Sequence, residues 1–237
     1  MNRSSTIKTC AIILAAGVGS RMQSKVTKQR LDILGHSVLY HSVMAFDVCE
    51  LIDSIVVVVR ESELEFAKAE LASSTKVFGI VIGGDTRAQS ARCGFLAIPD
   101  GTDFVAIHDA ARPLITSDGI STVVTAAYTE GAASALSPVT DTVKQVDENG
   151  FIVSTLDRSI LRSAQTPQVF SVEIYRRALA ACDDFGSITD DNMLVERIGV
   201  AIKGVDVGAE NPKITVPEDM AYAEFLLNRR IGGAKDD

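Results

Sequence analysis

Short, uninterrupted apolar runs recur along this 237-residue chain and constrain its fold more than any other feature. They occupy residues 10–15, 55–59, 77–82, 104–108, 132–139 and 200–205. Their residues do not alternate between apolar and polar, which is typical of strands buried on both faces of a parallel sheet. Helical patterns lie between and after them, at about 37–49, 61–72, 86–97, 117–130, 171–182, 190–198 and 217–230. The sequence therefore predicts an α/β fold of three layers, with a mostly parallel, twisted sheet between helices.

Residues 140–158 interrupt this alternation and predict a β-hairpin with its turn at Glu148-Asn149-Gly150. The hairpin has little apolar material of its own to bury, so it needs something to pack on, such as a second subunit. The sequence contains no linker, repeat or low-complexity tract. We therefore expect residues 1–237 to form one domain with a projecting arm at 140–158.

The composition excludes several classes of protein. With 46% hydrophobic and 23% charged residues, the chain is not expected to be disordered as a whole. A net charge of −8 argues against non-specific nucleic-acid binding. No apolar stretch approaches the ~20 residues of a membrane span. The four cysteines form no CxxC pair and the apolar stretch at 10–18 lacks an A-x-A-like cleavage site, so we expect a reduced, cytoplasmic protein.

The charge is unevenly distributed along the chain. No acidic residue precedes Asp32, and the first 31 residues carry six basic ones, whereas the remaining 206 residues carry a net −14. A local cationic segment on an acidic protein indicates a small anionic ligand, although a solvated basic N-terminal segment is the alternative.

A loop of small residues follows the first predicted strand, from Leu14 to Met22. Its members Ala15, Ala16, Gly17 and Gly19 would let backbone N–H groups approach phosphate oxygens without side-chain clashes, although a simple tight turn is the alternative. Met22 stands where the dinucleotide fingerprint has its third glycine, and the acidic residue expected about 20 positions later is missing. An NAD-linked fold is therefore not expected.

The same loop, with Arg21-Met22 and the later pair Lys28-Gln29, begins an ordered series of motifs that extends to about residue 228. The others are Gly83-Gly84-Asp85-x-Arg87-x-x-Ser90, His108-Asp109-Ala110-Ala111-Arg112-Pro113, Pro138-Val-x-Asp141-Thr142-x-Lys144, Asp157-Arg158, Gln165-Thr166-Pro167-Gln168, Thr189-Asp190-Asp191 and Asn211-Pro212-Lys213-Ile214-Thr215. In this series the chain resembles the 2-C-methyl-D-erythritol 4-phosphate cytidylyltransferases, the IspD family. It departs from the family pattern at Thr27, where proline is frequent, and at Glu210, where aspartate is frequent.

This resemblance implies a Rossmann-like nucleotidyltransferase fold of the GT-A-like type, with the hairpin as a dimerisation arm. It implies transfer of a cytidylyl group from CTP to the polyol phosphate 2-C-methyl-D-erythritol 4-phosphate. The products would be 4-diphosphocytidyl-2-C-methyl-D-erythritol and pyrophosphate, within the non-mevalonate isoprenoid (MEP) pathway. It also implies a homodimer that uses Mg²⁺.

The resemblance also implies roles for individual residues. The catalytic residues would be Arg21, Lys28 and Lys213. The nucleotide would be bound by Ala15, Ala16, Gly17, Gly19, Gly83, Gly84, Asp85 and Ser90. The acceptor would be bound by Arg112, Thr142, Arg158 and Thr166, of which Thr142 and Arg158 would reach the neighbouring subunit's site. Asp109 would hold Mg²⁺ together with triphosphate oxygens.

Taken singly, several of these residues have purely structural alternatives. Asp109 could be a helix N-cap, Arg158 a surface ion-pair partner and Lys213 a solvated lysine. Gly83 to Asp85 could be a plain turn, and His108 is expected to be a core histidine rather than a catalyst.

Two other functions remain open at this point. A ribitol-5-phosphate cytidylyltransferase would share the glycine loop, the cations and the Asp109 motif, because its acceptor is also a short polyol phosphate. A non-catalytic nucleotide-binding module would be expected to lack a reacting cation or the metal ligand, whereas Arg21, Lys28, Asp109 and Lys213 are all present.

Overall fold

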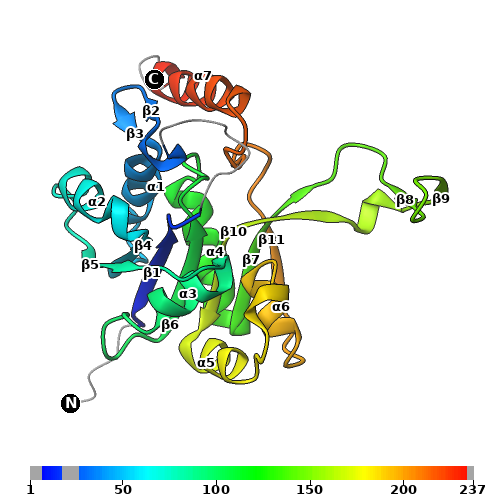
Figure 1. Cartoon of the computed structure of the whole chain (residues 1–237), viewed down its shortest axis with the longest axis horizontal. Coiled ribbons are helices and arrows are strands. Elements are labelled where there is room, and N and C mark those ends of the chain that lie inside the picture. Colours follow the sequence, from blue (N-terminus) through cyan, green and yellow to red (C-terminus); the bar gives the residue numbers. More distant parts are fainter. Residues whose placement is uncertain (1–6, 18–26, 234–237) are drawn as a thin grey trace.

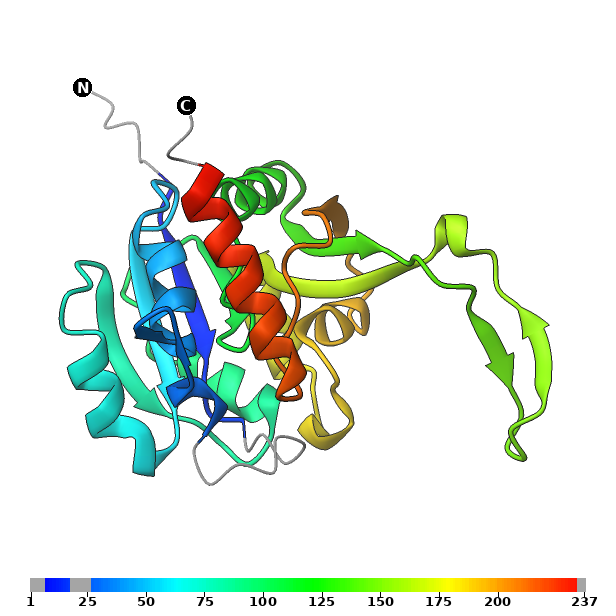
Figure 2. The same ribbon diagram turned by 90° about the horizontal axis from the view of Figure 1, so that it is seen from above.

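The computed structural model describes residues 7–17 and 27–233 and has a central sheet with helices on both faces (Figures 1 and 2). The strands are β1 (Thr9–Leu14), β4 (Ser54–Val59), β5 (Val77–Ile82), β6 (Phe104–Asp109), β7 (Ala132–Pro138), β10 (Arg162–Ser171) and β11 (Lys203–Asp206). Their order across the sheet is β11-β7-β10-β6-β1-β4-β5, and every pairing is parallel except the two made by β10. The predicted α/β fold with a mostly parallel sheet is confirmed.

The strand residues point alternately into two apolar cores, one on each face of the sheet. On β1, Ile13 packs in one core and Ile12 in the other, and both are fully buried. The first core is covered by α1 (Val38–Asp47), α2 (Leu64–Glu70) and α4 (Ser117–Glu130), and the second by α3 (Arg87–Phe95), α5 (Val172–Ala180) and α6 (Asp191–Glu196). Burial on both faces explains why these strands are continuously apolar.

Helix α3 lies close to the sheet at its last turn, where Gly94 faces β1 and β4. A Cβ atom on Gly94 would stand 2.4 Å from Cγ2 of Ile12 and 2.8 Å from Cγ2 of Val58, so only glycine fits there. The helix begins with a capping box, in which Thr86 and Gln89 satisfy each other's backbone N–H groups.

Strand β10 is the main element that the sequence pattern did not predict. It lies between β6 and β7 and runs antiparallel to both, with a bulge between Ala164 and Gln168. Its residues 162–168 are mostly polar and include Pro167, so it lacks the apolar run that marks the other strands. The buried side chains of Gln165, Thr166 and Gln168 are instead satisfied by hydrogen bonds to neighbouring segments.

A third, smaller core joins two loops that are distant in sequence. Helix α7 (Glu218–Gly233) places Leu226 against Ile33, Leu114 and Ile214. Ile33 belongs to a small hairpin, β2 (Asp32–Ile33) and β3 (His36–Ser37), which follows the 3-10 turn η2 (Lys28–Arg30). Ile214 directly follows Lys213. The third core therefore anchors both lysine-bearing segments.

The expected hairpin arm is present and projects away from the body of the molecule in both views (Figures 1 and 2). It consists of β8 (Lys144–Val146) and β9 (Ile152–Thr155), which pair antiparallel, followed by the 3-10 turn η4 (Arg158–Ile160). The arm exposes Val146, Phe151, Ile152, Val153 and Ile160. No helix in the described ranges 7–17 and 27–233 is long and apolar enough to cross a membrane.

The packing of α3 gives a first prediction. Gly94→Ala should lower the free energy of unfolding by about 1–3 kcal/mol, because the added methyl group meets Ile12 and Val58. Chemical denaturation would measure the change. Gly79→Ala on β5 is the matched control, since a Cβ there meets nothing within 4 Å, and it should change stability by less than about 0.5 kcal/mol. Equal effects of the two substitutions would contradict the close packing.

Candidate functional site

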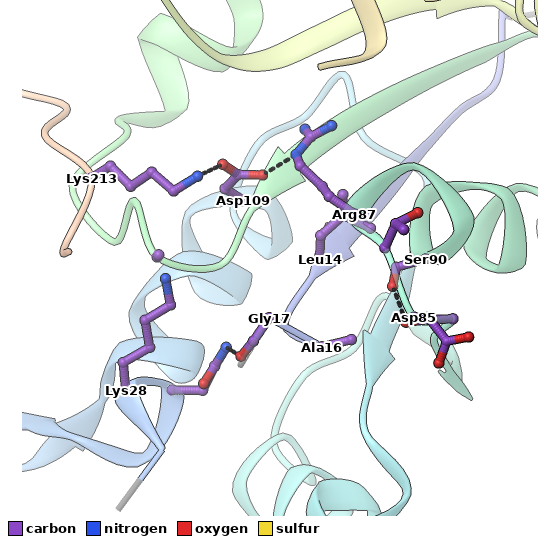
Figure 3. Close-up of a pocket in the computed structure, with 13 residues that line it drawn as sticks. Leu14, Ala16, Gly17, Lys28, Asp85, Arg87, Ser90, Asp109 and Lys213 are labelled. Carbon is purple, nitrogen blue, oxygen red and sulfur yellow. Dashed lines mark hydrogen bonds and ion pairs between the residues drawn. The ribbon is translucent and has the colours of Figure 1, made fainter. Parts of the chain in front are cut away.

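A pocket opens at the carboxyl ends of β1 and β6, where ligand sites of open α/β sheets form (Figure 3). It is lined by Leu14, Ala16, Gly17, Lys28, Gln29, Gly84, Asp85, Thr86, Arg87, Ser90, Asp109, Ala111 and Lys213. Eight of the residues predicted for catalysis, nucleotide binding or metal binding are thus brought together from distant parts of the sequence. They are Ala16, Gly17, Lys28, Gly84, Asp85, Ser90, Asp109 and Lys213.

The carboxylate of Asp109 is held between two cations at the floor of this pocket (Figure 3). Its Oδ1 accepts from Arg87 Nε at 2.9 Å, and its Oδ2 accepts from Lys213 Nζ at 2.6 Å. Although burial alone would raise the pKa of the Asp109 carboxyl, the charges of Arg87 and Lys213 hold this pKa well below its ordinary value. Asp109 is therefore ionised throughout the physiological range.

The two cations differ in how firmly they are held. Arg87 also donates from Nη1 to Oδ2 of Asp191 at 2.6 Å, and Asp191 is 1% exposed. Tyr175, itself buried, donates its hydroxyl to Oδ1 of Asp191 at 2.6 Å. Lys213 approaches from a loop and keeps 36% of its side chain exposed. Arg87 is thus a fixed cation, and Lys213 is the one that solvent and ligands reach.

Asp191 is in turn positioned by a buried amide of β10. The Oε1 atom of Gln168 accepts from the backbone N–H groups of Asp191 at 2.9 Å and of Asn192 at 3.2 Å. Its Nε2 donates to Oδ2 of Asp190 at 2.9 Å. Gln168, Asp190 and Asp191, which had no assigned role in the reaction, therefore support Arg87 from behind the pocket.

A second chain of hydrogen bonds orients the backbone of Asp109. Its N–H donates to Oγ1 of Thr166 at 3.1 Å, and this hydroxyl is 3.0 Å from Nδ1 of His108. Nε2 of His108 lies 3.1 Å from the carbonyl oxygen of Arg112, so Nε2 carries the proton and Nδ1 accepts from Thr166. Burial lowers the pKa of His108 to about 4, which keeps the ring neutral. The expectation of a core histidine is confirmed.

The predicted nucleotide loop, of which the structure describes residues 15–17, has close backbone contacts with its neighbours. The N–H of Ala15 donates to the carbonyl of Val58 at 2.7 Å and continues the sheet. A Cβ on Gly83 would lie 2.7 Å from both Cβ of Ala16 and Oγ of Ser90. Only glycine at position 83 therefore lets the turn after β5 pack this closely against Ala16. Gly19 and Arg21, which were also predicted for this site, lie outside the described residues.

Lys28 extends into the pocket from η2, beside Gln29 (Figure 3). Gln29 is 4% exposed and donates from Nε2 to the carbonyl of Gly17 at 3.4 Å. The preceding Thr27 has φ −65° and ψ 142°, and this φ is the value that a proline ring would impose. Thr27, where the family that the sequence resembles frequently has proline, therefore keeps a proline-like φ at the entry to η2.

The residues predicted to bind the acceptor are distributed differently. Arg112 donates to the carbonyls of Asn211 at 2.8 Å and Ala164 at 3.4 Å, next to the pocket. Thr166 is 4% exposed and lies behind Asp109. Thr142 and Arg158 are exposed on the arm, where Arg158 donates to the carbonyl of Thr140. Within the described part of this chain, the arm residues do not line the pocket.

The donor set fits Mg²⁺ only together with a phosphate ligand. In the described ranges, no group of three or more histidine, cysteine, aspartate or glutamate residues could hold a metal. Mg²⁺ commonly takes one or two carboxylates and completes its octahedron with substrate phosphates and water. Asp109 provides one ionised carboxylate at the pocket, which would be the protein's ligand to such an ion.

The supporting role of Arg87 is not predicted by the sequence pattern, although Arg87 belongs to the motif Gly83-Gly84-Asp85-x-Arg87-x-x-Ser90. An arginine two residues after Asp85, at the start of a helix that faces an aspartate at a strand end, was the available signal. Nothing in the sequence pattern indicated that Tyr175 would meet Asp191.

Comparisons with known proteins agree with the geometry. The sequence profile of the family described as IspD, 2-C-methyl-D-erythritol 4-phosphate cytidylyltransferase, matches residues 9–229. A protein of that name from Caldanaerobacter subterraneus is 41% identical over 223 residues, covering 92% of this chain and 98% of the relative. Another from Syntrophus aciditrophicus is 40% identical over 230 residues, covering 95% and 98%. The crystal structure of 4-diphosphocytidyl-2C-methyl-D-erythritol synthase from Anaerococcus prevotii superimposes with a TM-score of 0.81 at 27% identity, covering 94% of this chain and 99% of that one.

The unequal anchoring of the two cations gives a second prediction. Arg87→Met should lower the free energy of unfolding by about 3–5 kcal/mol, because it leaves Asp191 and Asp109 buried without their shared partner. Lys213→Met should cost only about 1 kcal/mol, because Lys213 is more exposed and Asp109 keeps Arg87. Denaturant titrations of both variants would compare them. A loss for Lys213→Met as large as that for Arg87→Met would contradict the division into a fixed and an accessible cation.

Proposed function

Because this chain belongs to the 2-C-methyl-D-erythritol 4-phosphate cytidylyltransferase family, it is a CTP-dependent cytidylyltransferase of the MEP pathway, and we propose that the pocket at Asp109 is its active site. The reaction joins 2-C-methyl-D-erythritol 4-phosphate to the cytidylyl group of CTP and releases pyrophosphate. The observation that carries the site assignment is the convergence of Lys28, Arg87 and Lys213 on the pocket that contains the Asp109 carboxylate.

The arrangement suits attack by a phosphate oxygen on the α-phosphorus of CTP. The attacking group is already an anion at neutral pH, so no general base is needed. The protein has to bring two anions together and neutralise the charge that builds up on the oxygens of the α-phosphate. Lys28 and Lys213 enter the pocket from different loops and supply this positive charge, and Arg21 is assigned the same task.

The base and ribose are assigned to the wall formed by Gly84, Asp85 and Ser90. Ser90 Oγ donates to the carbonyl of Gly84 at 3.3 Å, which fixes the turn where a nucleoside would contact the backbone. Ala16 and Gly17 face the same pocket from the opposite loop. This division leaves Arg112, at the Asn211 side, for the acceptor phosphate.

Asp109 is the residue assigned to Mg²⁺. When bound, the ion would neutralise part of the triphosphate charge and favour departure of pyrophosphate. Lys213, which also lines the pocket, would supply positive charge to an oxygen of the α-phosphate. Arg87 keeps the carboxylate of Asp109 oriented, because Asp191 holds its guanidinium group and Tyr175 holds Asp191.

The enzyme is further proposed to be a cytoplasmic homodimer. The arm carries exposed apolar side chains together with Thr142 and Arg158. A group of exposed apolar side chains on a projecting hairpin is typical of a surface that a partner subunit covers. All four cysteines are free, which suits a reduced compartment. The acceptor-binding roles of Thr142 and Arg158 belong to a neighbouring subunit's site under this proposal.

The direct test is pyrophosphate release from CTP and Mg²⁺, with 2-C-methyl-D-erythritol 4-phosphate and ribitol 5-phosphate assayed in parallel. Turnover is expected with the first acceptor alone. Lys28→Ala and Lys213→Ala should each reduce kcat by about 100-fold or more while changing the melting temperature little. Turnover with ribitol 5-phosphate alone would overturn the acceptor assignment, and wild-type kcat in Lys213→Ala would remove that residue from the reaction.

The dimer proposal gives a separate prediction. Arg158→Ala should raise the KM for the acceptor, because the guanidinium group that would bind its phosphate is lost. Mixing the Arg158→Ala and Lys28→Ala proteins should restore part of the activity, since some mixed dimers contain one site with both native residues. Activity of the mixture equal to the average of the two separate proteins would contradict an arm that reaches across subunits.

A further inference from the structure

Arg60 does not belong to the motifs that identify the family, but its side chain forms hydrogen bonds with the nucleotide loop. It directly follows β4, and its guanidinium group extends to the turn after the neighbouring strand β1. Nε donates to the carbonyl of Ala16 at 3.0 Å, and Nη2 donates to the carbonyl of Gly17. Gln29 donates to the same Gly17 carbonyl. Two successive peptide groups of the loop are thus fixed by one arginine.

The direction of these bonds decides where the loop's own donors point. In a planar trans peptide the C=O and the following N–H are directed to opposite sides. When Arg60 holds the carbonyl of Ala16, the N–H of Gly17 is turned away from Arg60. Within residues 7–17 and 27–233, no backbone hydrogen bond uses the N–H of Ala16 or Gly17. Both residues line the pocket, so these two donors are available to an anionic ligand.

Arg60 also brings positive charge that no described acid neutralises. Arg87, which lines the pocket, and Arg30, which follows Gln29 in η2, are both paired with carboxylates. Arg60 forms no ion pair with a carboxylate of the described segments. Its contacts are with carbonyl dipoles only, so its charge polarises the loop peptides and strengthens their N–H groups as donors.

We propose that Arg60 is a positioning residue for the triphosphate of CTP: it orients the peptide group between Ala16 and Gly17 so that the N–H of Gly17 binds a phosphate oxygen. This inference rests on the proposed function of the pocket. It assigns Arg60 to nucleotide affinity rather than to the chemical step, because Arg60 contacts the loop and not the pocket itself.

The test compares Arg60→Met and Arg60→Lys with the wild-type enzyme in steady-state kinetics and in calorimetric binding of CTP. Loss of both loop contacts in Arg60→Met should raise the KM and Kd for CTP by at least about tenfold. The KM for the acceptor should stay within about threefold, because the acceptor does not use this loop. Arg60→Lys keeps the positive charge and one donor nitrogen, so its KM and Kd for CTP should lie between those of the wild type and those of Arg60→Met. Arg176→Met on the exposed face of α5 is the matched control and should bind CTP as the wild type does.

The outcomes separate this inference from the function on which it rests. Wild-type protein that neither binds nor turns over CTP would overturn the proposed function itself. An active wild type with an unchanged KM for CTP in Arg60→Met would overturn the role of Arg60 alone, as would equal increases in the KM of both substrates. If Arg60→Met does not fold, as judged by its melting curve, Arg60→Gln replaces it, because this substitution also removes the charge. The change in the KM for CTP is then compared with the change in the KM for the acceptor in the same way.

Discussion

The ion pairs of Asp109 are the interaction on which the site depends. A carboxylate at the buried end of β6 is unfavourable unless cations compensate its lost hydration. Arg87 and Lys213 provide that compensation from α3 and from the loop before α7, so three distant segments meet at one group. Because breaking such a set leaves a buried charge unpaired, the segments are held in one arrangement, and the pocket exists between them.

The supports behind Asp109 explain why a polar strand lies in the middle of the sheet. An apolar β10 would have packed more simply between β6 and β7. Its Gln168 instead satisfies backbone N–H groups at the start of α6, and its Thr166 links the Asp109 backbone to His108. The strand therefore connects the two hydrogen-bonding chains that fix the side chain and the main chain of Asp109. Its polarity serves the geometry of the site rather than the stability of the core.

The sequence was most informative where one physical requirement dominates a segment. Burial on both faces marks β1, β4 and β6, and the small residues of 15–17 mark a close backbone approach, so these elements were predictable. β10 was not, because its buried positions are polar and are satisfied by partners far away in sequence. The convergence of Lys28, Asp109 and Lys213 followed from resemblance alone. Periodicity does not specify the distances between loops. The contacts of Arg60 with the nucleotide loop and of Tyr175 with Asp191 therefore have no signal in the local sequence.

The third core has a consequence for the order in which the protein matures. Leu226 of α7 packs on Ile33 and Ile214, and Arg230 of the same helix donates to the carbonyls of Leu114 and Glu210. The ribosome makes α7 after every other element that anchors the two lysine-bearing segments (Figure 2). A nascent chain can therefore assemble the sheet and its two large cores while the segments of Lys28 and Lys213 still lack their shared support. The two lysine-bearing segments therefore gain their shared support only after α7 has been made.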